Sequence, residues 1–290
     1  TLSSSSAASD VYKRQDFDSY QPKAQNFSKV RADFKEFSFA EQFGLLRLIR
    51  KLKPDLVHFG KDHQPILYWG KTVTTMHDLT TARFYNPNKN WFYFKFKQIV
   101  YVFVIMAAAW KSNRIITISE FMKKDLVSYT HVSPKKITVT LEAADKIDSP
   151  SEVLEEFAKK QFIFYIGRTL PHKNLQRLVE AFGILKKSHP DLNLLLVGKK
   201  DGMSARLEEF AKKNNIPDVH FPGFITEGQL RWLYKNCEAY IFPSLSEGFG
   251  LPPLEAMIHG APVVSSNATC LPEINGDAAH YFDPLDANDM

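Results

Sequence analysis

Short apolar runs alternate along this chain with longer segments in which apolar residues recur every three or four positions. The short runs are typical of buried parallel strands, and the longer segments are typical of amphipathic helices. The predicted strands cover residues 55–59, 71–76, 114–118, 136–141, 161–166, 192–197, 219–221, 239–242 and 262–265. The predicted helices cover residues 41–54, 91–110, 120–129, 174–187, 204–214, 226–236 and 252–260. This alternation predicts an α/β fold with parallel sheets and helices on both faces.

A polar stretch, 142–150, interrupts the alternation and is predicted to link two domains. A chain of 290 residues is long enough for two α/β domains. We therefore expect one domain over residues 16–148 and a second, doubly wound domain over residues 149–290. Residues 1–15 are rich in Ser and Ala and show no periodicity. They are predicted to be disordered or not native to the protein, and they are left out of the fold prediction.

The composition and charge of the chain indicate which kinds of partner the protein can bind. Hydrophobic residues make up 44% and charged residues 24% of the chain, which is ordinary for a globular protein. The net charge of +5 fits an anionic small ligand or a membrane surface, and there is no basic tract of the kind that binds nucleic acid. Cys237 and Cys270 lack metal-ligand spacing and are predicted to be buried thiols in a reducing compartment. No signal-peptide pattern is found, so the predicted location is the cytoplasm.

The segment from Trp91 to Trp110 is the one candidate for membrane contact. Its charge-free apolar run, 99–110, is too short to span a bilayer, and lysines interrupt the part before it. Aromatic residues crowd its first end, which would suit a helix lying at a membrane interface on the inner face. An ordinary core helix or inter-domain helix is the alternative with better support.

The stretch 243–257 carries the main candidate chemistry. It follows the apolar run 239–242, contains a glycine loop, and continues into a helix that Pro252 can open. A glycine loop before a helix N-terminus can receive an anion, and Glu247 and Glu255 can each accept two hydroxyls of a sugar or ribose. A surface loop with one acid balancing a helix dipole is an equally supported interpretation of these residues alone.

The spacing of Glu247 and Glu255, with seven residues between them, resembles the E-x7-E motif of the retaining glycosyltransferase family 4. The surrounding Pro-Ser-x-x-Glu-Gly-Phe-Gly-Leu-Pro-x-Leu-Glu-Ala-Met is also similar to that family. The resemblance implies that Glu247 contacts the donor sugar, Glu255 holds the ribose, and the backbone of Gly248, Phe249 and Gly250 faces the donor diphosphate. It also implies the GT-B fold, with two Rossmann-like doubly wound domains facing a central cleft.

Arg168 and Lys173 follow the predicted strand 161–166 and precede a helix. They resemble the family's Gly-Arg…Lys-Asn element, which implies binding of the donor diphosphate. Two fixed cations can stabilise the charge on a leaving nucleoside diphosphate, although solvated surface charges are the alternative for such a pair. No His/Asp/Glu cluster with metal-ligand spacing accompanies them, so neither a metal nor a cofactor is expected.

The histidine of Thr-x-His-Asp, His77, resembles a family residue that lines the cleft near the donor sugar, and it joins Glu247 as a candidate catalytic residue. Ser119 and Glu273 also match family segments and are predicted to be structural. Three further histidines are predicted to be structural as well: His58, His172 and His259.

The chain departs from the family in two places. Ala143 stands where relatives usually have a glycine. The opening strand and acceptor loop of the first domain and the C-terminal helix that crosses back to it have no counterpart. We therefore expect a fragment whose first domain is N-terminally incomplete.

These observations predict a glycosyltransferase that moves a hexose from a nucleotide-diphosphate sugar, of the GDP-mannose or UDP-glucose type, to a glycan or lipid-linked acceptor with retention of configuration. A GT-B sugar-nucleotide epimerase, which needs no acceptor, is one alternative. A non-catalytic nucleotide-sugar-binding fragment is another. A glycoside hydrolase is disfavoured, since its carboxylate pair needs no phosphate site.

Overall fold

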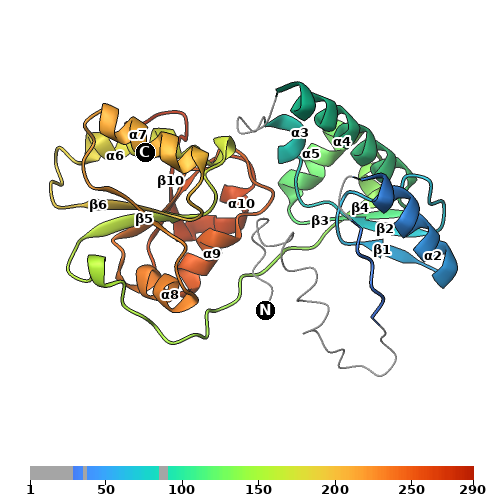
Figure 1. The fold of residues 1–290 in the computed structure, drawn as a ribbon, viewed down its shortest axis with the longest axis horizontal. Coiled ribbons are helices and arrows are strands. Elements are labelled where there is room, and N and C mark those ends of the chain that lie inside the picture. The colour runs from blue at the N-terminus through green and yellow to red at the C-terminus, as the bar shows by residue number, and fades with distance from the viewer. Residues whose placement is uncertain (1–28, 35–37, 85–90) are drawn as a thin grey trace.

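The computed structural model describes residues 29–34, 38–84 and 91–290. The segment 1–15 and the start of the predicted first domain, 16–28, lie outside these ranges. Within them the chain forms two α/β units, each built on its own parallel sheet (Figure 1). No helix or strand lies between Val139 and Glu155, and the predicted linker falls in this stretch.

The first sheet has four strands in sequential order: β1 (Val57–Phe59), β2 (Thr72–Thr75), β3 (Arg114–Thr117) and β4 (Ile137–Val139). All three pairings are parallel, with Val73 opposite Arg114 and Ile115 opposite Ile137. The helices are a π-helical turn (Glu41–Leu45) continuing into α2 (Leu46–Leu52), then α3 (Thr80–Arg83), α4 (Trp91–Lys111) and α5 (Glu120–Thr130). A 3-10 turn (Pro134–Lys136) leads into β4.

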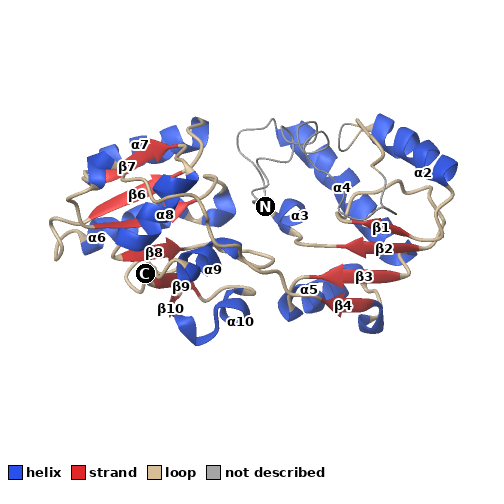
Figure 2. Ribbon diagram, turned by 90° about the horizontal axis from the view of Figure 1, so that it is seen from below, coloured by secondary structure: helices blue, strands red, loops and turns tan. Residues whose placement is uncertain are grey.

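The second sheet has six parallel strands in the order β10-β9-β8-β5-β6-β7. Their bounds are β5 (Phe162–Ile166), β6 (Asn193–Val197), β7 (Val219–Gly223), β8 (Ala239–Phe242), β9 (Val263–Ser266) and β10 (Ala279–Phe282). The connecting helices are α6 (Leu175–Leu185), α7 (Gly202–Lys213), α8 (Glu227–Asn236), α9 (Leu251–Ile258) and α10 (Leu271–Asn275). Helices α6 and α7 cover one face, and α8 and α9 cover the other (Figures 1 and 2).

The order of strands reverses between β5 and β8, as it does in doubly wound sheets. From β5 the chain builds outward through β6 and β7, and it then returns to add β8, β9 and β10 on the other side. Strands β5 and β6, at the centre of the sheet, are buried on both faces: four of the five residues of β5 and all five residues of β6 are buried. In doubly wound sheets, ligands bind at the carboxyl ends of the strands on either side of this reversal, here β5 and β8.

Two predicted helix starts are confirmed. Ser119 accepts the N–H of Met122, and Thr226 forms a reciprocal capping box with Gln229. Helix α7 begins two residues before its predicted start, because Asp201 caps it. The prediction that 262–265 completes the second sheet is wrong, since α10 and the edge strand β10 follow it. Only Phe282 of β10 is fully buried, so this strand has no continuous apolar run to reveal it.

The core of the second domain is largely aromatic. Phe164 contacts the rings of Tyr234 and Tyr240, and Phe162 stacks on Trp232 at 5.7 Å between ring centroids. Buried aromatic pairs contribute about 0.5–1.5 kcal/mol beyond the area they bury. Cys270 is buried and Cys237 is half-buried, and both are free thiols. Among the described helices, none combines the length and the apolar character that a bilayer span requires.

Candidate functional site

The predicted donor-binding residues come together at the reversal of the second sheet. Arg168 and Lys173 follow β5, and Glu247 follows the neighbouring strand β8. Because both strands are parallel, their carboxyl ends meet at the same edge of the sheet, where doubly wound proteins bind ligands. The strand alternation thus brings residues 74 positions apart into one site.

Lys173 and Glu247 form an ion pair, with 2.5 Å between Nζ and Oε1. Their side chains are only 18% and 14% exposed, so the pair is largely shielded from water. The turn that carries Lys173, Pro171–Lys173, is held to the β8 loop because the N–H of Leu245 donates to the carbonyl of His172 at 2.7 Å. The sequence suggested separate roles for this acid and this cation, and the structure makes them partners.

Arg168 has an unsatisfied donor at the same edge. Its Nε is buried and has no hydrogen-bond partner among the described residues, while its carbonyl accepts the hydroxyl of Tyr165 at 3.4 Å. A buried donor without an acceptor costs about 1–3 kcal/mol, and more when it is charged. An anion bound at this edge would satisfy the guanidinium.

The glycine loop 248–250 is in close backbone contact with the first domain. A Cβ on Gly248 would lie 2.1 Å from the carbonyl oxygen of His77, so only glycine fits there. The ring of Phe249 is 4% exposed and packs into the first-domain core with Met76 and Leu79. Gly250, at φ +95°, precedes α9, whose first turn contains Pro252 as predicted. The side chain of Phe249 is therefore an inter-domain contact, and only its backbone is available to a ligand.

His77 lies beside this loop at the end of β2. Its Nε2 is 3.6 Å from Oε1 of Glu142, and its side chain is 42% exposed. The structure therefore places the predicted catalytic histidine next to the predicted donor loop, although the two belong to different sheets.

Glu255 lies on α9 beneath the loop and has a different environment from Glu247. The hydroxyl of Tyr234 donates to its Oε2 at 3.4 Å. Burial raises the pKa of Glu255, and the Tyr234 hydrogen bond opposes part of that increase. The pKa of the buried Tyr234 hydroxyl is also raised, so it stays protonated as a donor.

His259 is structural, as predicted. Its Nδ1 bonds to the carbonyl of Glu255 at 2.7 Å, and its Nε2 accepts the N–H of Ile147 at 3.2 Å. Because Nε2 accepts, the proton lies on Nδ1. The imidazole ties the linker to the end of α9.

Two residues that the sequence analysis did not assign to the site also contact it. Thr269 accepts the N–H of Glu247 at 3.2 Å. The thiol of Cys270 lies 3.4 Å from the carbonyl oxygen of Glu247 and 3.3 Å from that of Phe249. These residues sit in a short polar loop after β9, and no motif marked them.

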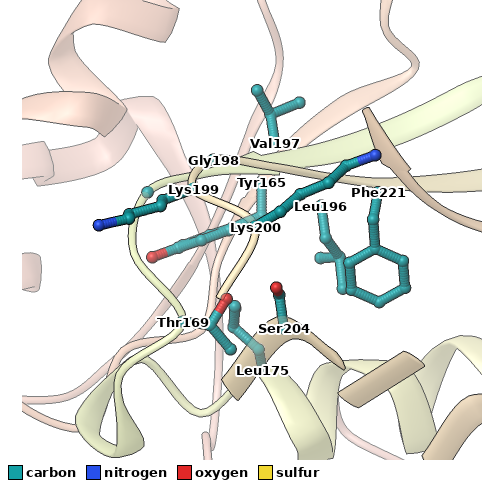
Figure 3. A pocket seen from close by; sticks show the side chains of 11 residues that line it. Tyr165, Thr169, Leu175, Leu196, Val197, Gly198, Lys199, Lys200, Ser204 and Phe221 are labelled. Carbon is teal, nitrogen blue, oxygen red and sulfur yellow. The ribbon is translucent and has the colours of Figure 1, made fainter. Parts of the chain in front are cut away.

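A narrow cavity opens at the carboxyl ends of β5 and β6 (Figure 3). Gly198 closely approaches the β5 loop, since a Cβ there would lie 2.1 Å from the carbonyl oxygen of Gly167. The hydroxyls of Thr169 and Ser204 and the lysines Lys199 and Lys200 are among its lining residues. The sequence analysis assigned no site here.

No group of three or more His, Cys, Asp or Glu side chains in the described part of the chain could hold a metal ion. The expectation of a metal-free site remains a prediction.

Comparisons with known proteins decide the family. The family model described as "Glycosyl transferases group 1" matches residues 124–288, which is more than half of the chain. The model of "Glycosyltransferase Family 4" matches residues 12–145. The chain belongs to the group 1 glycosyl transferases. The predicted resemblance to glycosyltransferase family 4 is confirmed.

Among relatives, O-antigen chain mannosyltransferase B of Escherichia coli is 29% identical over 251 residues, covering 79% of this chain and 64% of the relative. The serotype-specific mannosyltransferase WbdA of Escherichia coli is 29% identical over 238 residues, covering 76% of this chain and 28% of that protein. The chain thus spans less than two thirds of the length of these relatives.

Solved structures support the fold. Sucrose-phosphate synthase from Thermosynechococcus elongatus superposes with a TM-score of 0.67 at 20% identity, covering 84% of this chain and 64% of that one. Anabaena Alr3699/HepE, in complex with UDP and glucose, has a TM-score of 0.65 at 17% identity, covering 88% and 72%. The predicted GT-B fold, with two Rossmann-like units, is confirmed.

Proposed function

We propose that the protein transfers a hexose from a nucleotide-diphosphate sugar to a glycan or lipid-linked acceptor. The proposal rests on one observation: Arg168, Lys173 and Glu247 lie together where the strand order reverses, beside the backbone of His77. Relatives named as mannosyltransferases and a structural neighbour solved with UDP and glucose support a donor of the GDP-mannose or UDP-glucose type.

In this proposal Arg168 and Lys173 bind the donor diphosphate. The buried Nε of Arg168 lacks an acceptor, and a phosphate oxygen would supply one. Lys173 bonds to Glu247, so an arriving phosphate competes with that carboxylate for the ammonium. Glu247 then turns from Lys173 to the hydroxyls of the donor sugar, where its charge stabilises the positive charge that develops as the glycosidic bond breaks.

Glu255 would hold the ribose, because its carboxylate can accept two hydroxyls and already takes one from Tyr234. The backbone of Gly248, Phe249 and Gly250 would face the diphosphate at the start of α9. Retention of configuration and independence from metal ions belong to the proposal, which family membership supports.

The proposal includes contact between α4 and the inner face of an anionic membrane, where a lipid-linked acceptor would lie. Five apolar residues at helical spacing are 61–77% exposed: Phe92, Phe96, Ile99, Phe103 and Trp110. Two exposed lysines, Lys95 and Lys97, lie beside them, and α4 contains no acidic residue. An apolar stripe with cations at its edge suits a lipid interface with anionic headgroups. Helix α4 runs along the outside of the first domain (Figure 1).

Vesicle flotation tests this contact with phosphatidylglycerol vesicles and phosphatidylcholine vesicles in parallel. The protein should float with the anionic vesicles, and Phe96→Ser with Phe103→Ser should abolish flotation. Phe224→Ser removes a phenylalanine of the second domain that is more exposed than either of these, and it should have no effect. Equal flotation of all three proteins would show that α4 is not the contact surface.

Calorimetric titration with UDP and GDP tests the diphosphate site. Arg168→Ala or Lys173→Ala should weaken binding by roughly 1.5–3 kcal/mol, the range for a hydrogen bond to a charged group. Lys187→Ala removes an exposed cation just beyond the far end of α6 and serves as the matched control. Unchanged binding in both site variants would overturn the assignment.

A further inference from the structure

The N-terminus of α5 is capped by a residue of the other domain. The N–H groups of Glu120 and Phe121 donate to Oε1 and Oε2 of Glu273 at 2.7 and 2.8 Å. The first N–H groups of a helix have no partner within the helix, and a carboxylate there also meets the positive end of the helix dipole. Residues close in sequence usually supply this cap, whereas Glu273 lies 153 residues away from Glu120.

Ser119 extends the same contact to the glycine loop. Its Oγ accepts the N–H of Met122 at 3.1 Å and donates its own hydrogen to the carbonyl of Gly248 at 2.9 Å. The side chain is fully buried, so both bonds are shielded from water. The first turn of α5 is therefore bonded to the second domain at two points.

Glu273 is connected to the loop within its own domain. It sits on α10, the helix that directly follows Thr269 and Cys270. The side chains of these two residues contact the backbone of Glu247 and Phe249. Phe249 is in turn buried among Met76, Leu79 and Met122 of the first domain. Helices α9 and α10 face α5 in both views of the fold (Figures 1 and 2).

We infer that Glu273 is a positioning residue, and that Glu273, Ser119 and Phe249 form an inter-domain latch that holds the glycine loop against the first domain. The latch sets the position of Glu247 relative to His77, since Thr269 and Cys270, just before α10, contact the loop directly. Ser119 and Phe249 are buried, whereas Glu273 is solvent-exposed, so its two bonds are the ones that water can replace when the domains separate. The consequence for turnover rests on the proposed function, but the latch itself does not.

Hydrogen exchange measured by mass spectrometry, with small-angle scattering on the same samples, tests the latch without any substrate. In Glu273→Ala, the amides of Glu120 and Phe121 and those of the loop 245–251 should exchange at least about tenfold faster. The radius of gyration should increase. Glu273→Gln keeps one acceptor oxygen and should give an intermediate result. Asp277→Asn removes an exposed acid four residues away and should match the wild type.

Thermal unfolding of each variant separates loss of the latch from loss of the fold. A cooperative transition in Glu273→Ala with faster exchange confined to residues 120–121 and 245–251 supports the latch. Unchanged exchange at the loop and an unchanged radius of gyration would overturn it.

Activity gives a second readout. Glu273→Ala should lower kcat about tenfold while leaving the affinity for UDP or GDP within about twofold of the wild type. If the wild-type protein transfers no sugar, the proposed function fails while the exchange result still decides the latch.

Discussion

Replacing Glu247 with Gln should strengthen the binding of a nucleoside diphosphate. In the structure Oε1 of Glu247 lies 2.5 Å from Nζ of Lys173, and both side chains are at least four-fifths buried. A phosphate that bonds to the same ammonium must displace this carboxylate or lie beside it. In either case the negative charge of Glu247 opposes binding, and the neutral amide removes the opposition.

The size of the effect follows from the geometry. Two oxygens bonded to one ammonium lie roughly 5 Å apart. Two unit charges at about 5 Å in an effective dielectric of about 20 repel each other by about 3 kcal/mol. Solvent screening and loss of the Lys173 partner reduce this, so we expect a gain of roughly 1–2 kcal/mol, or roughly 5- to 30-fold in Kd.

The assay is calorimetric titration of UDP and GDP into the wild type, Glu247→Gln and the control Glu209→Gln. Glu209 is an exposed acid of the same domain, so its replacement makes the same change in net charge at a distance from the site. Glu247→Gln should also lower kcat, because the carboxylate contributes most in the transition state. Weaker or unchanged nucleotide binding in Glu247→Gln would refute the competition between phosphate and carboxylate for Lys173.

Three further predictions follow from other parts of the structure. Phe249→Ala should destabilise the protein by about 3–5 kcal/mol, because it empties a buried site between the domains, and chemical denaturation measures this; a loss below about 1 kcal/mol would contradict the packing. Burial, with a smaller contribution from Lys173, lowers the pKa of His172 to about 4, below its ordinary 6.5, so the free energy of unfolding should fall as pH drops from about 6.5 toward 4. His172→Gln should flatten that part of the stability profile, and an unchanged profile would count against a buried neutral imidazole. Activity should survive EDTA, and a loss that Mg²⁺ or Mn²⁺ restores would disprove a metal-free mechanism.

Local features of the chain were largely predictable from sequence. Strand alternation, the caps at Ser119 and Thr226, and the placement of Arg168 and Lys173 after a strand depend on nearby residues, which the sequence displays directly. Family resemblance then supplied the proposed roles of the acid pair, which the loop alone left undecided.

Contacts between distant segments were not predictable. The Lys173–Glu247 pair and the burial of Phe249 in the first-domain core depend on how strands and domains pack, and no periodicity encodes them. Glu273 is predicted to be structural, but its partners are the first N–H groups of a helix 152 and 153 residues away, and no sequence pattern reveals which distant residue will pair with them. Strand β10 was not predicted because only one of its four residues is fully buried, so the sequence shows no apolar run there.

The most direct test of the account is to incubate the intact protein with a panel of nucleotide sugars and a mixture of glycan and lipid-linked acceptors, and to detect products by mass. We predict that one nucleotide sugar is consumed, that an acceptor gains the mass of one hexose residue, and that Glu247→Gln loses this product. No consumption of any nucleotide sugar by the intact protein would contradict the proposed activity. Conversion of a nucleotide sugar to an isomer without transfer would instead indicate a sugar-nucleotide epimerase.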